Sequence, residues 1–291
     1  MVVGKRTRLQ RIGHFAAHAV LMAGALVMVM PMIWMLATSF KPPAEIALWP
    51  PVFWPRQPIT ANYTGAFQAA PFGRFFANSV AYSVVCTLSV ITTSLVAGAV
   101  FGKYRFPLRG FLFGLVLATA IVPFEAYMIP LYLQLVQIEW INTVQGIVLP
   151  YLFMAFGIFL MRQHVASAIP SELMEAARVD GAGEWWIMRR VIAPLSGNAL
   201  AAVAILAFNQ AWAMLIWPLL VANDQSLFNM ELGLTTFQFA FSNDTGKLMA
   251  GSVVSVVPML IVFLLMRRRI IENMALTGGC SEVCSVCTSC Q

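Results

Sequence analysis

Residues 76–101 read FANSVAYSVVCTLSVITTSLVAGAVF, and this run contains no charged side chain. A helix of about 20 apolar residues crosses a hydrocarbon core of roughly 30 Å. The run is therefore long enough to span a membrane once. A soluble helical protein with an unusually apolar core does not account for runs of this length.

Similar runs recur on both sides of it, and they predict an all-α membrane protein with six transmembrane helices. The chain is 60% hydrophobic and 10% charged, whereas a soluble domain is about 25% charged. Prolines in the runs are expected to kink the helices. The predicted spans are approximately 16–39, 76–101, 110–133, 144–161, 199–221 and 248–266, and the prolines are Pro31, Pro123, Pro130, Pro150, Pro218 and Pro258.

The basic residues predict how the chain is oriented. Of the 18 lysines and arginines, all but four fall on the side that holds both termini and the loops after the second and fourth spans. Cytoplasmic loops carry such an excess of positive charge, so we expect both termini in the cytoplasm. The net charge of +6 thus reflects topology, and it does not require a nucleic-acid partner. The four exceptions are Lys41, Arg56, Arg74 and Lys247.

Two segments are predicted on the opposite, outer side. Residues 41–75 are rich in proline, which favours an extended or turned chain over a regular helix. Residues 222–246 are polar, and they are interpreted either as a surface for a partner or as a plain solvated loop.

The most concentrated polar patch is Glu175-Ala176-Ala177-Arg178-Val179-Asp180-Gly181-Ala182, followed by Pro194. We expect one helix to begin at Ser171 as N-cap and to end at Asp180-Gly181, because glycine adopts the left-handed conformation that ends helices. A second short helix is expected over residues 183–192, stopping before Pro194. The pattern predicts a helix–turn–helix with a small-residue edge.

Such an edge is typical of a docking element, because small side chains let another backbone approach closely. Glu175 and Asp180 are expected to fix the register of docking, and residues 185–188 (Trp-Trp-Ile-Met) to supply an apolar complement. The patch contains no nucleophile–base pair, metal-ligand spacing or phosphate-binding glycine loop. The sequence therefore does not predict an enzyme.

The Glu-Ala-Ala-x-x-Asp-Gly-Ala pattern, with Pro194 thirteen residues after Gly181, resembles the EAA loop of permease subunits of bacterial binding-protein-dependent ABC importers. The resemblance extends over nearly the whole chain and is similar to the carbohydrate-uptake branch, in particular the second permease of maltose-type transporters. The segments that carry it include Ser39-Phe40-Lys41-Pro42, Asn78-Ser79, Arg105-Phe106-Pro107, Trp217-Pro218-Leu219 and Met249-Ala250-Gly251-Ser252.

The resemblance implies a type I importer permease fold over residues 1–279, with a coupling loop at 170–196. It implies three partners: a cytoplasmic ATPase dimer, a second permease and an extracytoplasmic solute-binding protein. The solute would be a sugar, such as a disaccharide, or glycerol phosphate. The implied ATPase-coupling residues are Glu175, Ala176, Ala177, Asp180, Gly181, Ala182 and Pro194. The alternative is a stand-alone secondary transporter or channel.

Three residues within the spans are candidates for the solute pathway. Glu125 is a carboxylate at predicted membrane depth, where ionisable groups are costly and often functional; alternatively, it is simply wet near the outer interface. Phe156 and Trp212 are candidates for stacking on sugar rings or for packing between helices.

The last residues, 280–291, form a cysteine-rich tail that departs from the family pattern. Cys280, Cys284, Cys287 and Cys290 have a spacing that suits zinc or an iron–sulfur cluster, but a metal site also needs a supporting fold. The alternatives are metal binding and an extension without function. We expect no cofactor.

Overall fold

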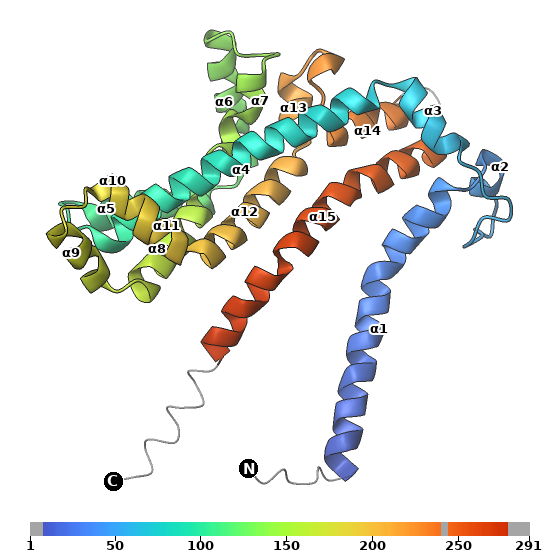
Figure 1. The fold of residues 1–291 in the computed structure, drawn as a ribbon. Helices are drawn as coiled ribbons and strands as arrows, with labels where there is room; N and C mark the ends of the chain where they lie inside the picture. Colours follow the sequence, from blue (N-terminus) through green and yellow to red (C-terminus); the bar gives the residue numbers. More distant parts are fainter. Residues whose placement is uncertain (1–7, 240–243, 279–291) are drawn as a thin grey trace. The chain divides into compact units, whose positions relative to one another are not determined.

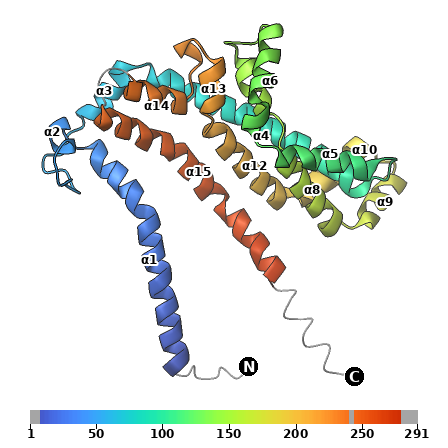
Figure 2. The same ribbon diagram turned by 180° about the vertical axis from the view of Figure 1, so that it is seen from behind.

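A computed structural model describes residues 8–239 and 244–278, and every regular element in that part of the chain is a helix. The cysteine-rich tail lies outside the described residues, so the expectations for it stay predictions. The helices are labelled in Figure 1, and Figure 2 shows the same ribbon from behind. They are α1 Arg8–Ser39, α2 Pro43–Ile46, α3 Ala61–Ala69, α4 Phe72–Lys103, α5 Arg109–Ile121, α6 Phe124–Gln137, α7 Val144–Val148, α8 Ala155–Ala168, α9 Ser171–Val179, α10 Glu184–Ile187, α11 Ala193–Leu195, α12 Gly197–Trp212, α13 Ile216–Val221, α14 Met230–Phe239 and α15 Thr245–Gly278.

The chain divides into two compact units. The first comprises Met1–Ala70 and Leu234–Val254, and the second comprises Pro71–Gly233 and Ser255–Gln291. The predicted functional residues all belong to the second unit.

Four stretches of helix are each long and apolar enough to cross a membrane: Gly13–Ser39, Phe72–Lys103, Gly197–Val221 and Thr245–Met266. They correspond to the first, second, fifth and sixth predicted spans. The third and fourth predicted spans are each divided between bent helices. The described residues therefore give six spans only if each bent pair counts as one.

Prolines explain where the third and fourth predicted spans break. Helices α5 and α6 meet at 98° around Pro123, where Val122 is extended (φ −74°, ψ 118°), as the residue before a proline usually is. In the fourth predicted span, α7 continues into a 3₁₀ turn that contains Pro150, and α8 follows after a 43° bend. By contrast, Pro31, Pro130 and Pro258 lie inside continuous helices.

The two outer segments contain more helix than the sequence indicated. The extended chain predicted for residues 41–75 was wrong in part, because α2 and α3 form there and α4 already begins at Phe72. Residues 61–69 contain no proline, and Pro43 begins α2, where a missing N–H costs nothing. The polar segment 222–246 likewise contains α14 and the start of α15.

In the first unit, Asn62 fixes the C-terminal end of α1. Its side-chain amide donates to the carbonyls of Ser39 and Lys41, both at 2.8 Å. The buried ammonium of Lys41 donates to the Val52 carbonyl at 2.6 Å and lies 4.2 Å from the ring centroid of Trp34. The Asn62 amide thus satisfies the Ser39 carbonyl, which the end of α1 leaves without a helical partner, and the contacts of Lys41 give a physical reason for the lysine of the Ser39–Pro42 motif.

In the second unit, α4 packs against α8 on one side and α12 on another, as both views show (Figures 1 and 2). Glycines allow α4 and α8 to approach closely. A Cβ added at Gly98 would lie 2.5 Å from the Cβ of Met161, and one added at Gly157 would lie 2.5 Å from the Ser94 hydroxyl. Small residues at such interfaces are the usual means by which membrane helices pack.

Two apolar clusters lie along α4, one toward each end. The C-terminal half of α4 shares a cluster with α8, the 170–196 segment and α12, which includes Ala99, Met161, Val165, Ile187 and Ile192. The N-terminal half shares the other with α6, α7, α12 and α13, which includes Tyr82, Leu135, Ile147, Ala211 and Trp217.

Near the N-terminal end of α4, polar side chains hold the 222–230 segment. The amide of Asn78 donates to the carbonyls of Ser226 and Phe228 at 2.8 and 2.9 Å, and the Met230 N–H donates to the Ser79 hydroxyl at 2.7 Å. The Asn78-Ser79 pair of the sequence motif therefore attaches an outer segment to α4.

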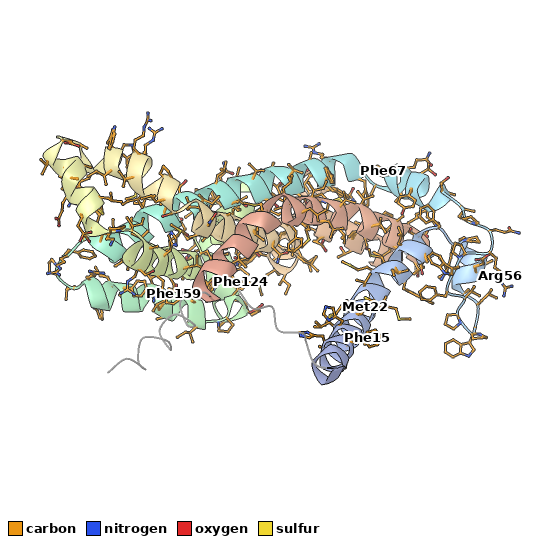
Figure 3. The ribbon with its side chains drawn as sticks, turned by 60° about the horizontal axis from the view of Figure 1, so that its bottom comes forward. Phe15, Met22, Arg56, Phe67, Phe124 and Phe159 are labelled. Carbon is orange, nitrogen blue, oxygen red and sulfur yellow. The ribbon has the colours of Figure 1, made fainter. Side chains whose placement is uncertain are left out.

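Many apolar side chains remain exposed on the described helices. Phe15 and Met22 project from α1 with 79% and 68% of their surface exposed (Figure 3). Exposed apolar surface of this extent requires lipid or another membrane protein as its surroundings.

The packing of α4 on α8 predicts opposite effects for two glycine substitutions. Gly98→Ala places a Cβ against Met161 and the Arg162 backbone nitrogen, and we expect a loss of about 1–3 kcal/mol of stability from overpacking. Gly114→Ala in α5 meets no atom within 4 Å and should leave stability unchanged or slightly raised. The apparent melting temperatures of the detergent-solubilised variants measure this difference. Equal values would show that α4 and α8 do not approach as closely as described.

Candidate functional site

The candidate site is the segment between α8 and α12, called here loop 170–196, at the C-terminal end of α4 (Figures 1 and 2). Its first helix, α9, begins directly after Pro170, whose backbone is extended (φ −62°, ψ 138°). The N-cap position is therefore Pro170, and the prediction that Ser171 would be the N-cap was wrong. Proline can occupy the N-cap position because its ring fixes φ at about −65°, close to the φ of −62° that Pro170 has here. The ammonium of Lys103 donates to the Ile169 carbonyl, which attaches this entry to α4.

The end of α9 confirms the predicted glycine turn. Gly181 has φ +82°, its N–H donates to the Arg178 carbonyl at 3.0 Å, and the Ala182 N–H donates to the Ala177 carbonyl at 2.9 Å. This pair of bonds is a Schellman motif, which satisfies free carbonyls at a helix end. Residues of L configuration with a side chain are strained at this φ, so the motif favours glycine here.

The second helix of the loop differs from the prediction. Helix α10 passes into a π-helical stretch at Met188–Ile192 and then into α11, so the helical path continues through Pro194. The expectation that it would stop before Pro194 was wrong. A proline inside an α-helix lacks its N–H and crowds the carbonyl four residues earlier. The wider π turn occurs directly before Pro194, where it accommodates both effects.

One face of the loop is buried in the protein. Met174, Ile187, Met188 and Ile192 are almost fully buried and pack with α4 and α8 residues such as Ala99 and Val165. Two of the four residues expected to form an apolar complement for a partner therefore lie inside the core. Trp185 and Trp186 remain exposed.

The opposite face is open and carries the small residues. Ala177, Asp180, Gly181, Ala182, Gly183 and Trp186 line a shallow hollow of about 420 Å³. The carboxylates of Glu175 and Asp180 are exposed, and within residues 8–239 and 244–278 no side-chain hydrogen bond or ion pair engages them. The arrangement offers a small-residue hollow with free carboxylates beside it, as expected for a docking surface. Pro194 is exposed, but it does not line this hollow.

Three residues that sequence reasoning did not select hold the loop to α4. Arg178 makes a two-pronged ion pair with Glu184, with Nε–Oε1 at 2.7 Å and Nη2–Oε2 at 3.2 Å. The Tyr104 hydroxyl donates to the same carboxylate, and the Arg178 guanidinium lies 5.8 Å from the Tyr104 ring centroid. We call Tyr104, Arg178 and Glu184 the clasp.

The clasp shifts the pKa values of its own members. Hydrogen bonds from Arg178 and then from Tyr104 lower the pKa of Glu184, so its carboxylate stays ionised and the pair is lost only as the pH falls below the ordinary carboxyl range. Burial, followed by the hydrogen bond to Glu184, raises the pKa of Tyr104, which keeps its hydroxyl protonated as a donor. The only sequence signal for the clasp was opposite charge six residues apart across a glycine turn.

Two further arginines close the C-terminal end of α4 beside the loop. Arg162 Nε donates to the Phe101 carbonyl at 3.2 Å, and Arg109 donates to the same carbonyl and to that of Gly102. Arg162 also lies over the ring of Phe113, 4.1 Å from its centroid. Cations at this position interact favourably with the helix dipole.

The three solute-pathway candidates lie on different helices, and the structure records no contact among them in the described residues. Glu125 is exposed in the first turn of α6, and Phe156 is half-exposed on α8, next to Phe159. Trp212 is fully buried, stacks on Phe208, and donates from its indole nitrogen to the Ser255 carbonyl at 3.1 Å.

A role for these three residues in solute passage stays a prediction. The described residues contain no cluster of His, Cys, Asp and Glu side chains suited to a metal ion.

Comparisons with known proteins show the family of this chain. Residues 94–270 match the family model described as "Binding-protein-dependent transport system inner membrane component". The chain is 33% identical to the arabinooligosaccharides transport system permease protein AraQ of Halalkalibacterium halodurans, over 87% of this chain and 92% of that protein. It is 31% identical to the lactose transport system permease protein LacG of Rhizobium radiobacter, over 92% and 97%.

A solved structure has the same fold. It belongs to a bacterial ABC transporter involved in the import of the acidic polysaccharide alginate, and one of its chains superposes with a TM-score of 0.81 at 22% identity. The match covers 91% of this chain and 99% of that one.

The Schellman turn predicts a contrast between two neighbouring glycines. Gly181→Ala forces a side chain into the left-handed region and should destabilise the turn by about 1 kcal/mol. Gly183 has φ −73°, and a Cβ added there would meet no atom within 4 Å. Gly183→Ala should therefore have little effect. Hydrogen exchange of the amides of residues 180–183 reports on this turn. Equal exchange in both variants would contradict the assigned conformation of Gly181.

Proposed function

The chain belongs to the family of binding-protein-dependent transport system inner membrane components, and from that membership we propose that loop 170–196 receives a cytoplasmic ATPase. The chain is a multi-pass inner-membrane permease subunit of an ABC importer. The family consists of transport permeases and not of enzymes. ATP hydrolysis therefore belongs to a separate subunit of such an importer.

The open hollow of loop 170–196 is the observation that carries the coupling role. A shallow hollow of about 420 Å³ lies between the α9 end and Trp186, on the exposed face of the loop that would sit in a cleft of the ATPase. Its small residues allow close backbone approach, and the free carboxylates of Glu175 and Asp180 would fix register by pairing with the partner's donors. The buried face of the loop, meanwhile, connects it to α4 and α8.

The proposed topology places both chain termini and loop 170–196 in the cytoplasm. Its support is the asymmetry of the basic residues, of which all but four of 18 fall on that side. Arg189 and Arg190 of the loop are among these residues, and both are exposed.

The proposed assembly has four kinds of component. Beside this chain we propose a second permease, a dimer of ATPase subunits and an extracytoplasmic solute-binding protein. The family implies such partners, and the extensive exposed apolar surface of α1 and α4 is consistent with a neighbour in the membrane as well as lipid. This chain would then supply half of the translocation pathway.

The proposed solute is a small oligosaccharide. AraQ is named for arabinooligosaccharides and LacG for lactose, and this chain covers nearly all of both relatives. Glycerol phosphate is the second candidate, and it differs by carrying a dianionic group that needs cationic partners. The six spans predicted from the sequence contain no lysine or arginine for that purpose.

Two substitutions test the coupling role. Gly181→Asp adds a charged side chain where φ is +82°. Glu175→Lys replaces a negative charge beside the hollow with a positive one. We expect each to lower ATPase binding and ATP-driven uptake at least about tenfold, a loss of about 1.4 kcal/mol of interaction. Both proteins should still insert in the membrane, because the buried face of the loop is unchanged.

Matched variants control for charge alone. Gly110→Asp adds the same group to the first turn of α5, where nothing lies within 4 Å, and Glu172→Lys makes the same reversal elsewhere on α9. Both should keep uptake. Normal uptake in Gly181→Asp and Glu175→Lys would contradict the coupling role, and uptake without any ATPase subunit would favour a secondary transporter.

The solute is tested on the reconstituted importer with its binding protein. We expect transport-coupled ATP hydrolysis to rise with di- and trisaccharides, and not with glycerol phosphate. Stimulation by glycerol phosphate alone would contradict the oligosaccharide proposal while leaving the coupling role intact.

A further inference from the structure

We propose that the clasp of Tyr104, Arg178 and Glu184 passes the displacement of loop 170–196 on to α4 during transport. The inference rests on the proposed coupling role of that loop. It assigns positioning roles to three residues that lie outside the docking hollow.

The Arg178–Glu184 pair closes the turn of the loop. Arg178 lies in the last turn of α9 and Glu184 is the first residue of α10, so their two hydrogen bonds bridge the turn at Gly181. Glycine can change its backbone conformation more readily than other residues. A paired guanidinium and carboxylate restrict that freedom, because the two-pronged geometry fixes direction as well as distance. The two helices then move together.

Tyr104 connects this closed turn to α4. It directly follows the last residue of α4, and its hydroxyl donates to the Glu184 carboxylate. Lys103, one residue earlier, donates to the Ile169 carbonyl at the start of the loop. The loop is thus joined to α8 by the peptide chain and to the end of α4 by side-chain contacts at its start and near its middle.

The Arg178–Glu184 ion pair contributes little to the stability of the fold. Its loss can therefore change how the loop moves α4 without unfolding the loop. The side chains of Arg178 and Glu184 are 41% and 53% exposed, and exposed ion pairs stabilise proteins only weakly. The loop is held in place mainly by its four buried side chains, Met174, Ile187, Met188 and Ile192. Loss of the clasp should therefore leave a folded loop that turns more freely relative to α4.

The experiment measures solute imported per ATP hydrolysed by the complete importer in proteoliposomes. Arg178→Glu and Glu184→Arg each place like charges across the turn, and Tyr104→Phe removes the hydrogen bond from the end of α4 to Glu184 while leaving the ion pair. We expect each to lower the import-to-hydrolysis ratio at least about fivefold, the effect of about 1 kcal/mol. ATPase binding and the apparent melting temperature should stay at the wild-type values.

The charge-swapped double variant, Arg178→Glu with Glu184→Arg, tests the pair directly. It restores opposite charges, and we expect the ratio to return to within about twofold of wild type, since interacting residues are not additive. Arg189→Glu and Glu172→Arg make the same charge changes on exposed positions of the loop outside the clasp, and they should leave the ratio unchanged.

The outcomes separate this inference from the proposed function. Wild-type import-to-hydrolysis ratios in all three single variants would overturn the proposed role of the clasp. So would a fall in this ratio that parallels a fall in melting temperature and does not recover in the double variant. If the wild-type chain itself bound no ATPase subunit, the proposed function would fail first and the clasp with it.

Discussion

The close approach of α4 and α8 is the contact on which the second unit depends. Lipid tails are as apolar as the side chains they surround, so membrane helices gain little from hydrophobic burial against each other. They associate where backbones come near enough for dense packing and for polar groups to meet. Gly98 and Gly157 create that approach. Once α8 is fixed on α4, loop 170–196 follows α8 directly and its apolar face meets the end of α4.

The sequence predicted the large features because they follow from composition and simple stereochemistry. Run length predicted the membrane spans, and Gly181 predicted the end of α9, since few other residues adopt φ +82°. The spans that contain Pro123 and Pro150 were harder to predict. A proline signals a break, but whether the helix bends or continues depends on its neighbours, and Pro130 and Pro258 remain inside helices.

The candidate site was predicted in position and only partly in composition. Local pattern identified the small residues of the hollow, because they are consecutive in the chain. It could not identify Tyr104, which lies 80 residues from Glu184 and meets it only through folding. It also did not divide the Trp185–Met188 run, in which two residues face solvent and two are buried. Consecutive helical residues point in different directions, and the packing of the loop on α4 and α8 decides which of them are buried.

The π-helical stretch at Met188–Ile192 has a consequence for how this segment can vary among related chains. Each residue of an α-helix turns the next by about 100°, so adding or removing one residue here would rotate everything downstream by that angle. The hollow around Gly181 and the buried face of α12 would then no longer point in compatible directions. The interval of thirteen residues from Gly181 to Pro194 therefore sets the direction in which the hollow points relative to the buried face of α12. Exposed side chains in this interval, such as those of Arg189 and Arg190, can change more readily than its length.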